Sequence, residues 1–382
     1  MIGKFFRSSA GLSILAVLVS FVVGGVLIAF SNADVQAASS YFFASPLDTI
    51  RAIGTSVFGA YDAMFRGAVF NYQAGNFVEM IRPITETLAY ATPITMAGLG
   101  LAVAFRSGLF NIGGTGQILF GAMFAGWVGI NVHLPFILLF PLAVVAGVLG
   151  GALFGGLVGL LKATTGANEV IVTIMFNYIA AMLLEYLLKT PFLQAPNTVN
   201  PISAPIQNDA KYPAFLGTDF RLHAGFFAML AAVWFVWWLL NRSSLGFQFR
   251  ALGHNPSAAR VAGININRTY ILVMAVSGAL AGLAGTAQIL GTEGVLTTGV
   301  AASYGFDAIT VALLGRNNPL GVLAAGILFG GLRAGAVTMQ ANQNVPIDIV
   351  FIVQSMIVLF IAAPPLVRAI FRLRDKQKEA AK

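Results

Sequence analysis

The sequence lacks cysteine altogether, and only 9% of its 382 residues are charged. Without cysteine there are no disulfides, thiolate metal sites or cysteine nucleophiles. The low charge excludes a soluble globular enzyme, because about a quarter of the residues in ordinary soluble chains are charged. The patterns GxxxxGK[ST], HExxH and GxSxG do not occur, so no local signature of nucleotide binding, metalloprotease activity or acyl transfer is present. The three histidines, His133, His223 and His254, lie far apart and do not indicate a metal site.

Apolar residues are abundant, at 58% of the chain, and the mean hydropathy is +0.83. They occur in repeated uncharged runs of about 20 residues, the length that an α-helix needs to cross a bilayer. The composition therefore predicts an all-α, polytopic membrane protein whose main surroundings are the lipid bilayer.

The apolar runs predict about ten helical segments in a single transmembrane domain, residues 1–382. Full spans are expected at residues 11–30, 84–105, 112–130, 135–161, 170–188, 223–240, 270–290 and 346–363. Residues 306–314 and 320–332 are short and predict re-entrant half-helices, which are tolerated only inside protein. The first run could be a signal peptide, but its length and the many later spans favour a retained helix.

The positions of Lys and Arg predict the orientation, because positively charged loops stay in the cytoplasm. With the N-terminus inside, 14 of the 22 Lys and Arg residues fall in cytoplasmic segments, including the tail at residues 364–382. Both termini are then cytoplasmic. The net charge of +8 is explained by topology, and no nucleic acid is required as a partner.

Two long connections fall on the outer face. Residues 31–83 include a stretch at 47–70 whose apolar residues recur with helical spacing, as in an amphipathic helix on a membrane surface. Residues 189–222 contain five prolines and predict an ordered, non-helical loop. Either segment could cap a pathway or dock an external partner, or could be an ordinary connection.

The cytoplasmic segment at residues 242–268 carries its own helix signals. Asn255 can cap a helix, Pro256 suits the first helical position, and Gly263 follows the end. No acid occurs between Asp219 and Glu293. A basic loop would satisfy the positive-inside rule without a capped helix, so the pattern favours a docking function.

Several polar residues interrupt the apolar runs, where they are costly and mark either a pathway or a contact between helices. A glycine-rich break precedes one span, and Thr173 and Asn177 share a helical face with Glu169. For any one residue, a hydrogen bond between helices competes with contact to a ligand. As a set, amides and hydroxyls outnumber charges and favour a polar, uncharged solute, with these candidates: Asn111, Gln117, Asn177, Gln288 and Asp307.

Four segments together resemble the permease subunits of bacterial ABC importers. They are Phe-Asn-Ile-Gly at 110–113 with Gly-Gln at 116–117, Asn-Glu-Val-Ile at 168–171 with Asn-Tyr at 177–178, the loop at 250–263, and Phe-Asp-Ala-Ile at 306–309 with Leu-Leu-Gly at 313–315. The resemblance covers nearly the whole chain from about residue 84. The sequence is similar to the branched-chain, sugar and nucleoside permease family, and most similar to the nucleoside branch.

The resemblance implies a type II importer-like permease that forms half of a translocation pathway in the bacterial cytoplasmic membrane. It also implies three partners: a second permease subunit, a cytoplasmic ATPase that binds ATP and Mg²⁺, and an extracytoplasmic substrate-binding lipoprotein. This chain would then hold no cofactor, no metal and no catalytic residue. The expected ATPase coupling residues are Arg250, Gly253, Asn255, Arg260 and Gly263.

For a nucleoside cargo, Phe176 or Tyr178 could stack on a base. One departure from the resembled family is Thr115, which stands where similar permeases commonly carry an acid.

Three other functions compete with nucleoside import. The same machine could carry a simple sugar such as ribose or galactose, which differs only in polar contacts. An ion-coupled secondary transporter would need no ATPase, but membrane ionisable groups are sparse and no acid–histidine relay is visible. A non-transporting scaffold would leave the capped basic helix unexplained.

Overall fold

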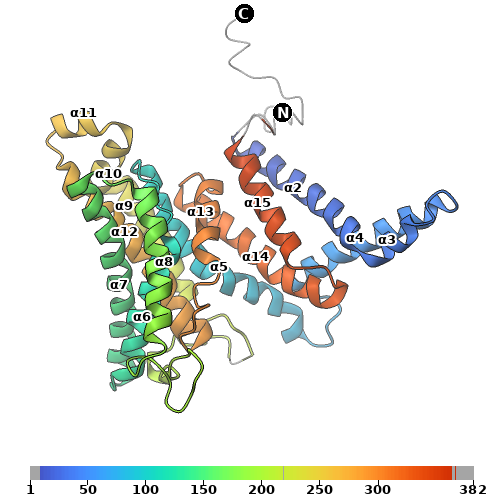
Figure 1. The fold of residues 1–382 in the computed structure, drawn as a ribbon, viewed down its shortest axis with the longest axis horizontal. Coiled ribbons are helices and arrows are strands. Elements are labelled where there is room, and N and C mark those ends of the chain that lie inside the picture. Colours follow the sequence, from blue (N-terminus) through green and yellow to red (C-terminus); the bar gives the residue numbers. More distant parts are fainter. Residues whose placement is uncertain (1–8, 218, 364–365, 367–382) are drawn as a thin grey trace, which may run out of the picture. The chain divides into compact units, whose positions relative to one another are not determined.

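The computed structural model describes residues 9–217, 219–363 and 366, and this part of the chain is helical without any β-sheet (Figure 1). It contains fourteen α-helices, of which seven are long and apolar enough to cross a membrane. The prediction of an all-α polytopic protein is therefore confirmed. The basic tail predicted at 364–382 lies outside the described residues, apart from residue 366.

The helices follow the chain as α2 (Ser9–Ser31), α3 (Ala33–Ser39), α4 (Pro46–Ala68), α5 (Phe77–Arg106), α6 (Gly114–Asn131), α7 (Phe136–Thr165), α8 (Glu169–Leu187), η1 (Asn208–Ala210), α9 (Gly225–Arg242), α10 (Ser244–His254), α11 (Pro256–Val261), α12 (Ile266–Thr286), η2 (Ala287–Glu293), α13 (Tyr304–Leu314), α14 (Pro319–Gln343) and α15 (Asp348–Ala362). Every predicted span overlaps one of these helices.

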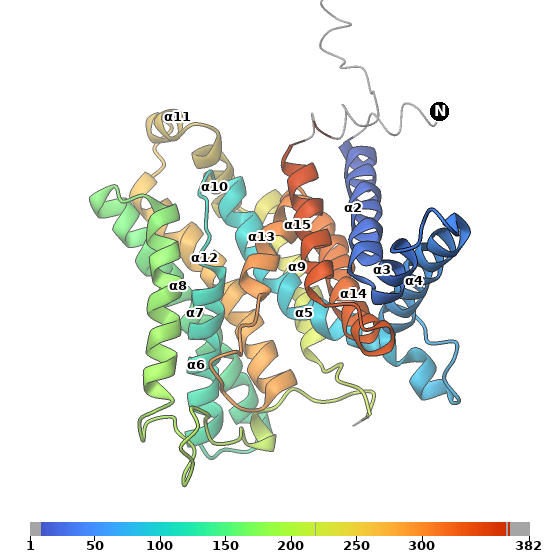
Figure 2. The same cartoon turned by 45° about the vertical axis from the view of Figure 1, so that its right-hand side comes forward.

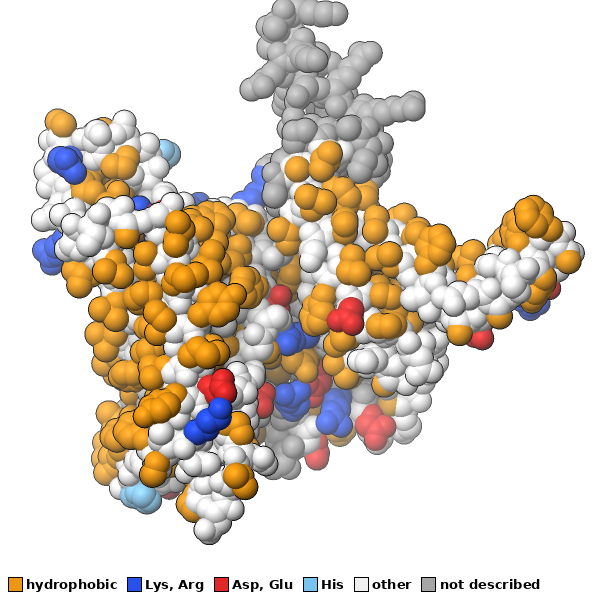
Figure 3. Space-filling view, in the orientation of Figure 1, with side chains coloured by type: hydrophobic (Ala, Val, Ile, Leu, Met, Phe, Trp, Pro, Cys, Tyr) orange, Lys and Arg blue, Asp and Glu red, His pale blue; other side chains and the backbone are white. Residues whose placement is uncertain are grey.

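The chain divides into two compact units, residues 88–330 and residues 1–87 with 331–382. Within the 88–330 unit, α7 packs along α12 and α6, and α12 also packs on α6 (Figure 2). Exposed apolar side chains cover α7 and α8 on the opposite side from these contacts (Figure 3). This distribution suits helices that face lipid on one side and protein on the other.

Glycine makes the contact between α7 and α12 unusually close. A Cβ atom on Gly151 would meet the Gly278 carbonyl oxygen and lie 2.6 Å from the Gly282 Cα atom. A Cβ on Gly278 would in turn meet the Gly151 carbonyl oxygen. Lipid offers no hydrophobic drive for helix association, so such close backbone packing supplies much of the attraction between membrane helices.

The loops of the 88–330 unit gather at two ends with different charge. We call one the basic end: it carries the connections at 107–113, 166–168 and 243–265, with Arg106, Lys162 and four further arginines. The other, the opposite end, carries the loops at 132–135, 188–224 and 294–303. They are joined there by hydrogen bonds such as Gln207 N to Gly129 O (3.1 Å) and Ser203 N to Leu296 O (3.0 Å). Successive connections between α5 and η2 thus alternate between the two ends, as in a chain that crosses back and forth.

The second unit joins both ends of the described chain. Helix α2 packs on α15 and on α4, and α4 packs on the C-terminal half of α14, where Gly67 lies against Thr338. The amphipathic stretch predicted at 47–70 is α4. Its small residues, such as Ala60 and Ala63, are buried and its large ones, such as Phe58, are exposed.

Three details differ from the prediction. The prediction of a half-helix at 320–332 is wrong, because α14 is 25 residues long and ends at Gln343. Its later polar residues do not end the helix, since Thr338 and Gln343 pack against glycines of α4. The loop at 242–268 holds a second helix, α10, and the span at 270–290 ends as a π-helix, η2. The short helix at 306–314 is confirmed as the 11-residue α13.

Replacing Gly151 by alanine should destabilise the protein by about 1–3 kcal/mol, because the new methyl group cannot fit beside the α12 backbone. Gly156→Ala is a matched control on the same helix, since its Cβ would lie 3.6 Å from the Ala275 Cβ, an ordinary contact. Thermal unfolding of the purified protein in detergent measures both. Equal unfolding temperatures for the two variants would contradict the close packing.

Candidate functional site

The connection between α5 and α6 begins at the surface of the basic end, where Gly108 and Phe110 are exposed, and enters the interior of the 88–330 unit at Asn111. Residues 107–113 are not helical, although Asn111 within them is fully buried. Backbone groups at such a break cannot use lipid as a partner and must be satisfied by protein. We call residues 107–113 the buried break.

Helix α8 satisfies the buried break with three side chains spaced four residues apart. Glu169 Oε1 accepts from Phe110 N (3.4 Å), and Thr173 Oγ1 accepts from Ile112 N (3.3 Å). Asn177 donates from Nδ2 to Ile112 O (3.0 Å) and accepts at Oδ1 from Gly116 N (2.7 Å). The face predicted for Glu169, Thr173 and Asn177 therefore exists, and it points at a backbone.

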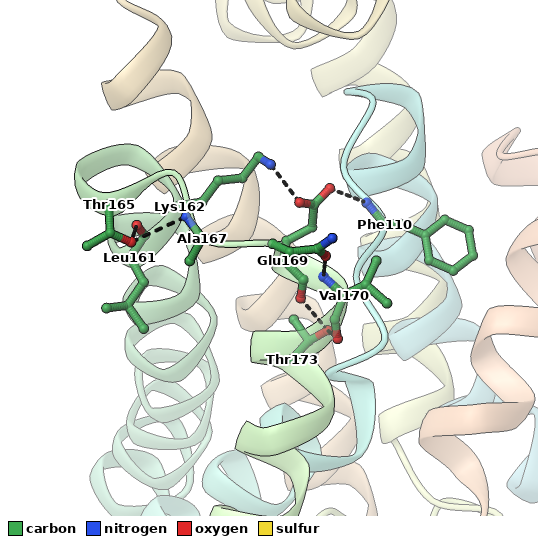
Figure 4. Close-up of polar contacts among 9 residues, drawn as sticks. Phe110, Leu161, Lys162, Thr165, Ala167, Glu169, Val170 and Thr173 are labelled. Atoms are coloured by element: carbon green, nitrogen blue, oxygen red, sulfur yellow. Dashed lines mark hydrogen bonds and ion pairs between the residues drawn. The ribbon is translucent and has the colours of Figure 1, made fainter.

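Glu169, the first of these three side chains, also forms a partly buried ion pair at the basic end. Lys162 Nζ, in the last turn of α7, lies 2.6 Å from Glu169 Oε2, and it also lies 5.3 Å from the centroid of the Tyr270 ring. Figure 4 shows the Glu169 carboxylate between the Lys162 amine and the Phe110 backbone nitrogen. Asn168 caps α8 by accepting from Val170 N (2.9 Å). The pair ties the start of α8 to both α7 and the buried break.

A cluster of buried polar side chains, which we call the amide cluster, is centred on Asn111 of the buried break. Asn111 Nδ2 donates to Gln117 Oε1 (3.1 Å) and to Ser277 Oγ (2.9 Å) of α12. Asn111 Oδ1 accepts from Gly113 N (2.8 Å). Asn111, Gln117 and Ser277 are all at most 1% exposed. The two predicted amides are thus brought together, and in this conformation they bond to each other.

The two aromatic candidates next to Asn177 have different surroundings. Phe176 is half-buried and its ring centroid lies 5.0 Å from that of Phe154, which stacks on Phe120. Tyr178 is 65% exposed and does not join the polar face. Only Phe176 therefore belongs to an aromatic cluster.

The remaining pathway candidates lie on separate elements. Gln288 is buried in η2, where its Nε2 donates to Glu293 Oε1 (2.9 Å). Asp307 lies in the first turn of α13 and accepts from Ser303 Oγ (2.8 Å). Thr115 at the start of α6 contacts Gly305 of α13, and its buried hydroxyl has no hydrogen-bond partner in the described chain. The starts of α6 and α13 therefore meet inside the protein.

The capped helix predicted in the basic loop is confirmed as α11. Asn255 Oδ1 accepts from Ser257 N (2.9 Å) and Ala258 N (3.1 Å), and Pro256 occupies the first helical position. The helix is followed by Gly263, whose φ of +82° suits glycine. Arg260 is exposed on α11, and Arg250 is partly exposed on α10. No ion pair involves Arg242, Arg250, Arg260 or Arg268 in the part of the chain that the structure describes.

Helix α10 ends against the start of the buried break. A Cβ on Gly253 would lie 2.9 Å from the Ser107 carbonyl carbon, and one on Gly108 would lie 3.1 Å from the Gly253 Cα. Glycine at position 253 therefore lets the two backbones touch. The α10–α11 segment and the buried break are in direct contact.

At the opposite end, the predicted non-helical loop at 189–222 folds over η2. Tyr212 donates its backbone N–H to Leu290 O (3.0 Å), and its hydroxyl lies 3.1 Å from Thr286 Oγ1. Burial lowers the pKa of His223 to about 4, and the charge of Arg221 acts in the same direction. His223 is therefore neutral near pH 7. No group of three or more His, Asp or Glu side chains among the described residues could hold a metal ion.

Sequence reasoning missed three contributors to this site. Ser277 lies in a Gly- and Ala-rich stretch of the predicted span, a pattern that indicates close helix packing but does not identify a hydrogen-bond partner. Lys162 was assigned to topology alone, although an acid follows it seven residues later. Tyr212 carries no local signal, because its partner Thr286 lies 74 residues away.

Comparison with known proteins gives a family match over most of the chain. Residues 84–362 match the family described as the branched-chain amino acid transport system permease component. This segment contains the buried break, α8, the α10–α11 segment and α13. No solved structure matches the chain.

Three similar proteins cover most of the sequence. The guanosine ABC transporter permease NupP of Bacillus subtilis is 37% identical over 325 residues, 85% of this chain and 91% of that protein. The nucleoside ABC transporter permease NupB of Lactococcus lactis is 36% identical over 74% of this chain and 79% of its own length. The glucose ABC transporter permease TsgB13 of Haloferax volcanii is 33% identical over 92% and 86%, respectively.

Replacing Asn177 by alanine should destabilise the buried break, because Ile112 O and Gly116 N would lose their partner away from water. We expect a loss of about 1–3 kcal/mol, measured as a lower unfolding temperature in detergent. Tyr178→Leu, one residue along the chain and exposed, is the control and should unfold like the wild type. An Asn177→Ala protein as stable as Tyr178→Leu would show that α8 does not support the break.

Proposed function

This chain belongs to the permease-component family of the branched-chain amino acid transport type, and we propose that it is the permease subunit of an ATP-driven ABC importer for nucleosides. It would form half of a translocation pathway, completed by a second, homologous permease subunit. It is a transport component and not an enzyme. ATP and Mg²⁺ would be bound by a separate cytoplasmic ATPase, and an extracytoplasmic binding protein would deliver the solute.

The observation that carries the nucleoside assignment is the similarity to two nucleoside-type permeases, at 37% and 36% identity over most of the chain. The polar groups in the interior support it, because amides and hydroxyls suit an uncharged solute with several hydrogen-bonding groups. Import of a simple sugar is the second candidate, since TsgB13 is 33% identical over 92% of the chain.

We place the pathway along the polar interior of the 88–330 unit, with six of the predicted residues as candidates: Asn111, Gln117, Phe176, Asn177, Gln288 and Asp307. The seventh, Tyr178, is exposed and lies outside this interior. Asn111 and Gln117 are bonded to each other in this conformation. A solute that passes these two residues would therefore replace the hydrogen bond between them with hydrogen bonds to itself. The unpartnered hydroxyl of Thr115 is one further group that a nucleoside hydroxyl could use.

The coupling step is assigned to the α10–α11 segment, with Arg250, Gly253, Asn255, Arg260 and Gly263. Its arginines have no ion-pair partner within the described chain, so an acidic surface of the ATPase can take them. Gly253 touches the first residues of the buried break. A displacement of α11 by the ATPase would thereby reach the amide cluster through one backbone contact.

The orientation follows from the same segment. An ATPase works in the cytoplasm, so the basic end of the 88–330 unit would face it. The cytoplasmic location proposed for both chain termini rests on the positive-inside pattern of the sequence. The multi-pass protein would then reside in a bacterial cytoplasmic membrane, and the loop at 189–222 would face the binding protein.

Uptake by the complete system tests the proposed function. Proteoliposomes containing this chain, its sister permease, its ATPase and its binding protein should accumulate labelled guanosine or uridine only when ATP is supplied. Excess unlabelled nucleoside should abolish this uptake, and excess ribose or glucose should not. Uptake driven by an ion gradient without ATP would overturn the ABC assignment, and sugar uptake without nucleoside uptake would overturn the cargo.

The coupling role predicts a defect in Asn255→Ala, because Ser257 N and Ala258 N lose their cap. A cap contributes about 1 kcal/mol to helix stability, so α11 should be less well formed and ATP-dependent uptake should fall. Ser257→Ala removes an exposed hydroxyl from the same helix and should transport normally. Co-purification with a tagged ATPase provides a second measurement. Undiminished uptake and co-purification for Asn255→Ala would remove α11 from the coupling step.

A further inference from the structure

A cavity of about 470 Å³ opens beside the α10–α11 segment and is separate from the amide cluster. It is bounded by the start of α10, the turn at 262–265 and the first turns of α12. Both neighbouring long helices, α9 and α12, are apolar enough to span a membrane, and α9 ends at Arg242 just before α10 begins. The cavity therefore lies where two spanning helices leave the bilayer.

One part of the cavity lining consists of hydrogen-bond donors without partners. The hydroxyl of Ser244, the amide nitrogen of Gln248, Nδ2 of Asn265 and the guanidinium of Arg268 make no hydrogen bond or ion pair within the described residues. Asn265 uses only its oxygen, which accepts from Arg268 N (3.0 Å). The sequence has no acid from residue 220 to residue 292, so the surrounding chain supplies no carboxylate for Arg268.

The rest of the lining is mainly apolar. Leu245 and Phe247 on α10 are 40% and 59% exposed, and Ile264 and Leu272 complete this side. A free anion such as inorganic phosphate would leave these apolar side chains exposed to water. A ligand with an anionic head and a hydrocarbon chain matches both parts of the lining.

The surface around the cavity is also basic. The α10–α11 corner, at the upper left of Figure 3, shows Lys and Arg side chains and no Asp or Glu. Arg242, Arg250 and Arg260 lie on the same segment as Arg268. A basic residue that contacts an anionic headgroup contributes about fivefold to its binding, so the lining residue Arg268 should count for more than Arg242, which lies outside the cavity.

We propose that this cavity binds the headgroup of an anionic phospholipid such as phosphatidylglycerol. Its phosphate would accept hydrogen bonds from Arg268, Asn265 and Gln248, and an acyl chain would lie along Leu245, Phe247 and Leu272. The lipid would occupy the space between α10 and α12 and so stabilise the position of α11. The proposal rests on the proposed function for the assignment of the basic end to the cytoplasmic face, and its cavity adjoins the proposed coupling segment, with Gly263 in both.

Native mass spectrometry of the purified chain tests the proposal without any transport partner. With equal amounts of phosphatidylglycerol and phosphatidylcholine added in detergent, the wild type should retain phosphatidylglycerol at least fivefold better. Arg268→Gln should lose about fivefold of this retention, and Phe247→Ala should also weaken it. Arg242→Gln is the matched control, because it removes an exposed, unpaired arginine that does not line the cavity.

Two outcomes would overturn the proposal. Equal loss in Arg268→Gln and Arg242→Gln would show that only the general positive charge matters. Displacement of the lipid by millimolar inorganic phosphate or glycerol phosphate would show a phosphate site with no role for the acyl chain. Because retention needs neither ATPase nor nucleoside, a chain that binds the lipid but supports no nucleoside uptake would refute the proposed function alone.

Discussion

The 88–330 unit depends on one constraint. The backbone N–H and C=O groups of the buried break must find hydrogen-bond partners within the protein. A chain that enters the membrane interior without helical structure exposes N–H and C=O groups that lipid cannot bind. Here α8 places Glu169, Thr173 and Asn177 at intervals of four residues, and each bonds to the backbone between residues 110 and 116. Residues that sequence reasoning placed on a solute pathway are therefore first of all structural partners of the break.

This arrangement links the chemistry of the interior to the basic end. The buried break begins at Ser107 and Gly108 against Gly253 of α10, and it continues into Asn111, whose amide bonds Gln117 and Ser277. At the basic end, the Lys162–Glu169 pair joins α7 and α8 to the backbone of Phe110 in the buried break. Under the proposed function, this connection would carry a displacement of the α10–α11 segment to the interior, because packed elements move as bodies rather than bending continuously.

The tight contact of α7 with α12 provides the frame for that connection. Gly151 and Gly278 bring the two backbones together, and Ser277, beside Gly278, reaches Asn111. The polar cluster and the glycine contact are therefore adjacent parts of α12. Where α12 begins, at the other end of the same helix, Arg268 and Leu272 line the cavity proposed for an anionic lipid. One helix thus joins the frame, the amide cluster and the membrane surface.

The sequence by itself determined the class of fold, the approximate spans and the capped helix at 256–261, because apolar run length, charge placement and capping residues act locally. It also found Asn111, Gln117 and Asn177 as unusual residues. Only the tertiary structure decided that Asn111 pairs with Gln117 and Ser277, that Asn177 bonds to a backbone while Tyr178 faces outward, and that α14 continues to Gln343. Apart from the Asn111–Gln117 pair, which is six residues apart, these outcomes depend on partners 61 or more residues away along the chain. A hydrogen bond or a backbone contact over that separation leaves no periodic signal.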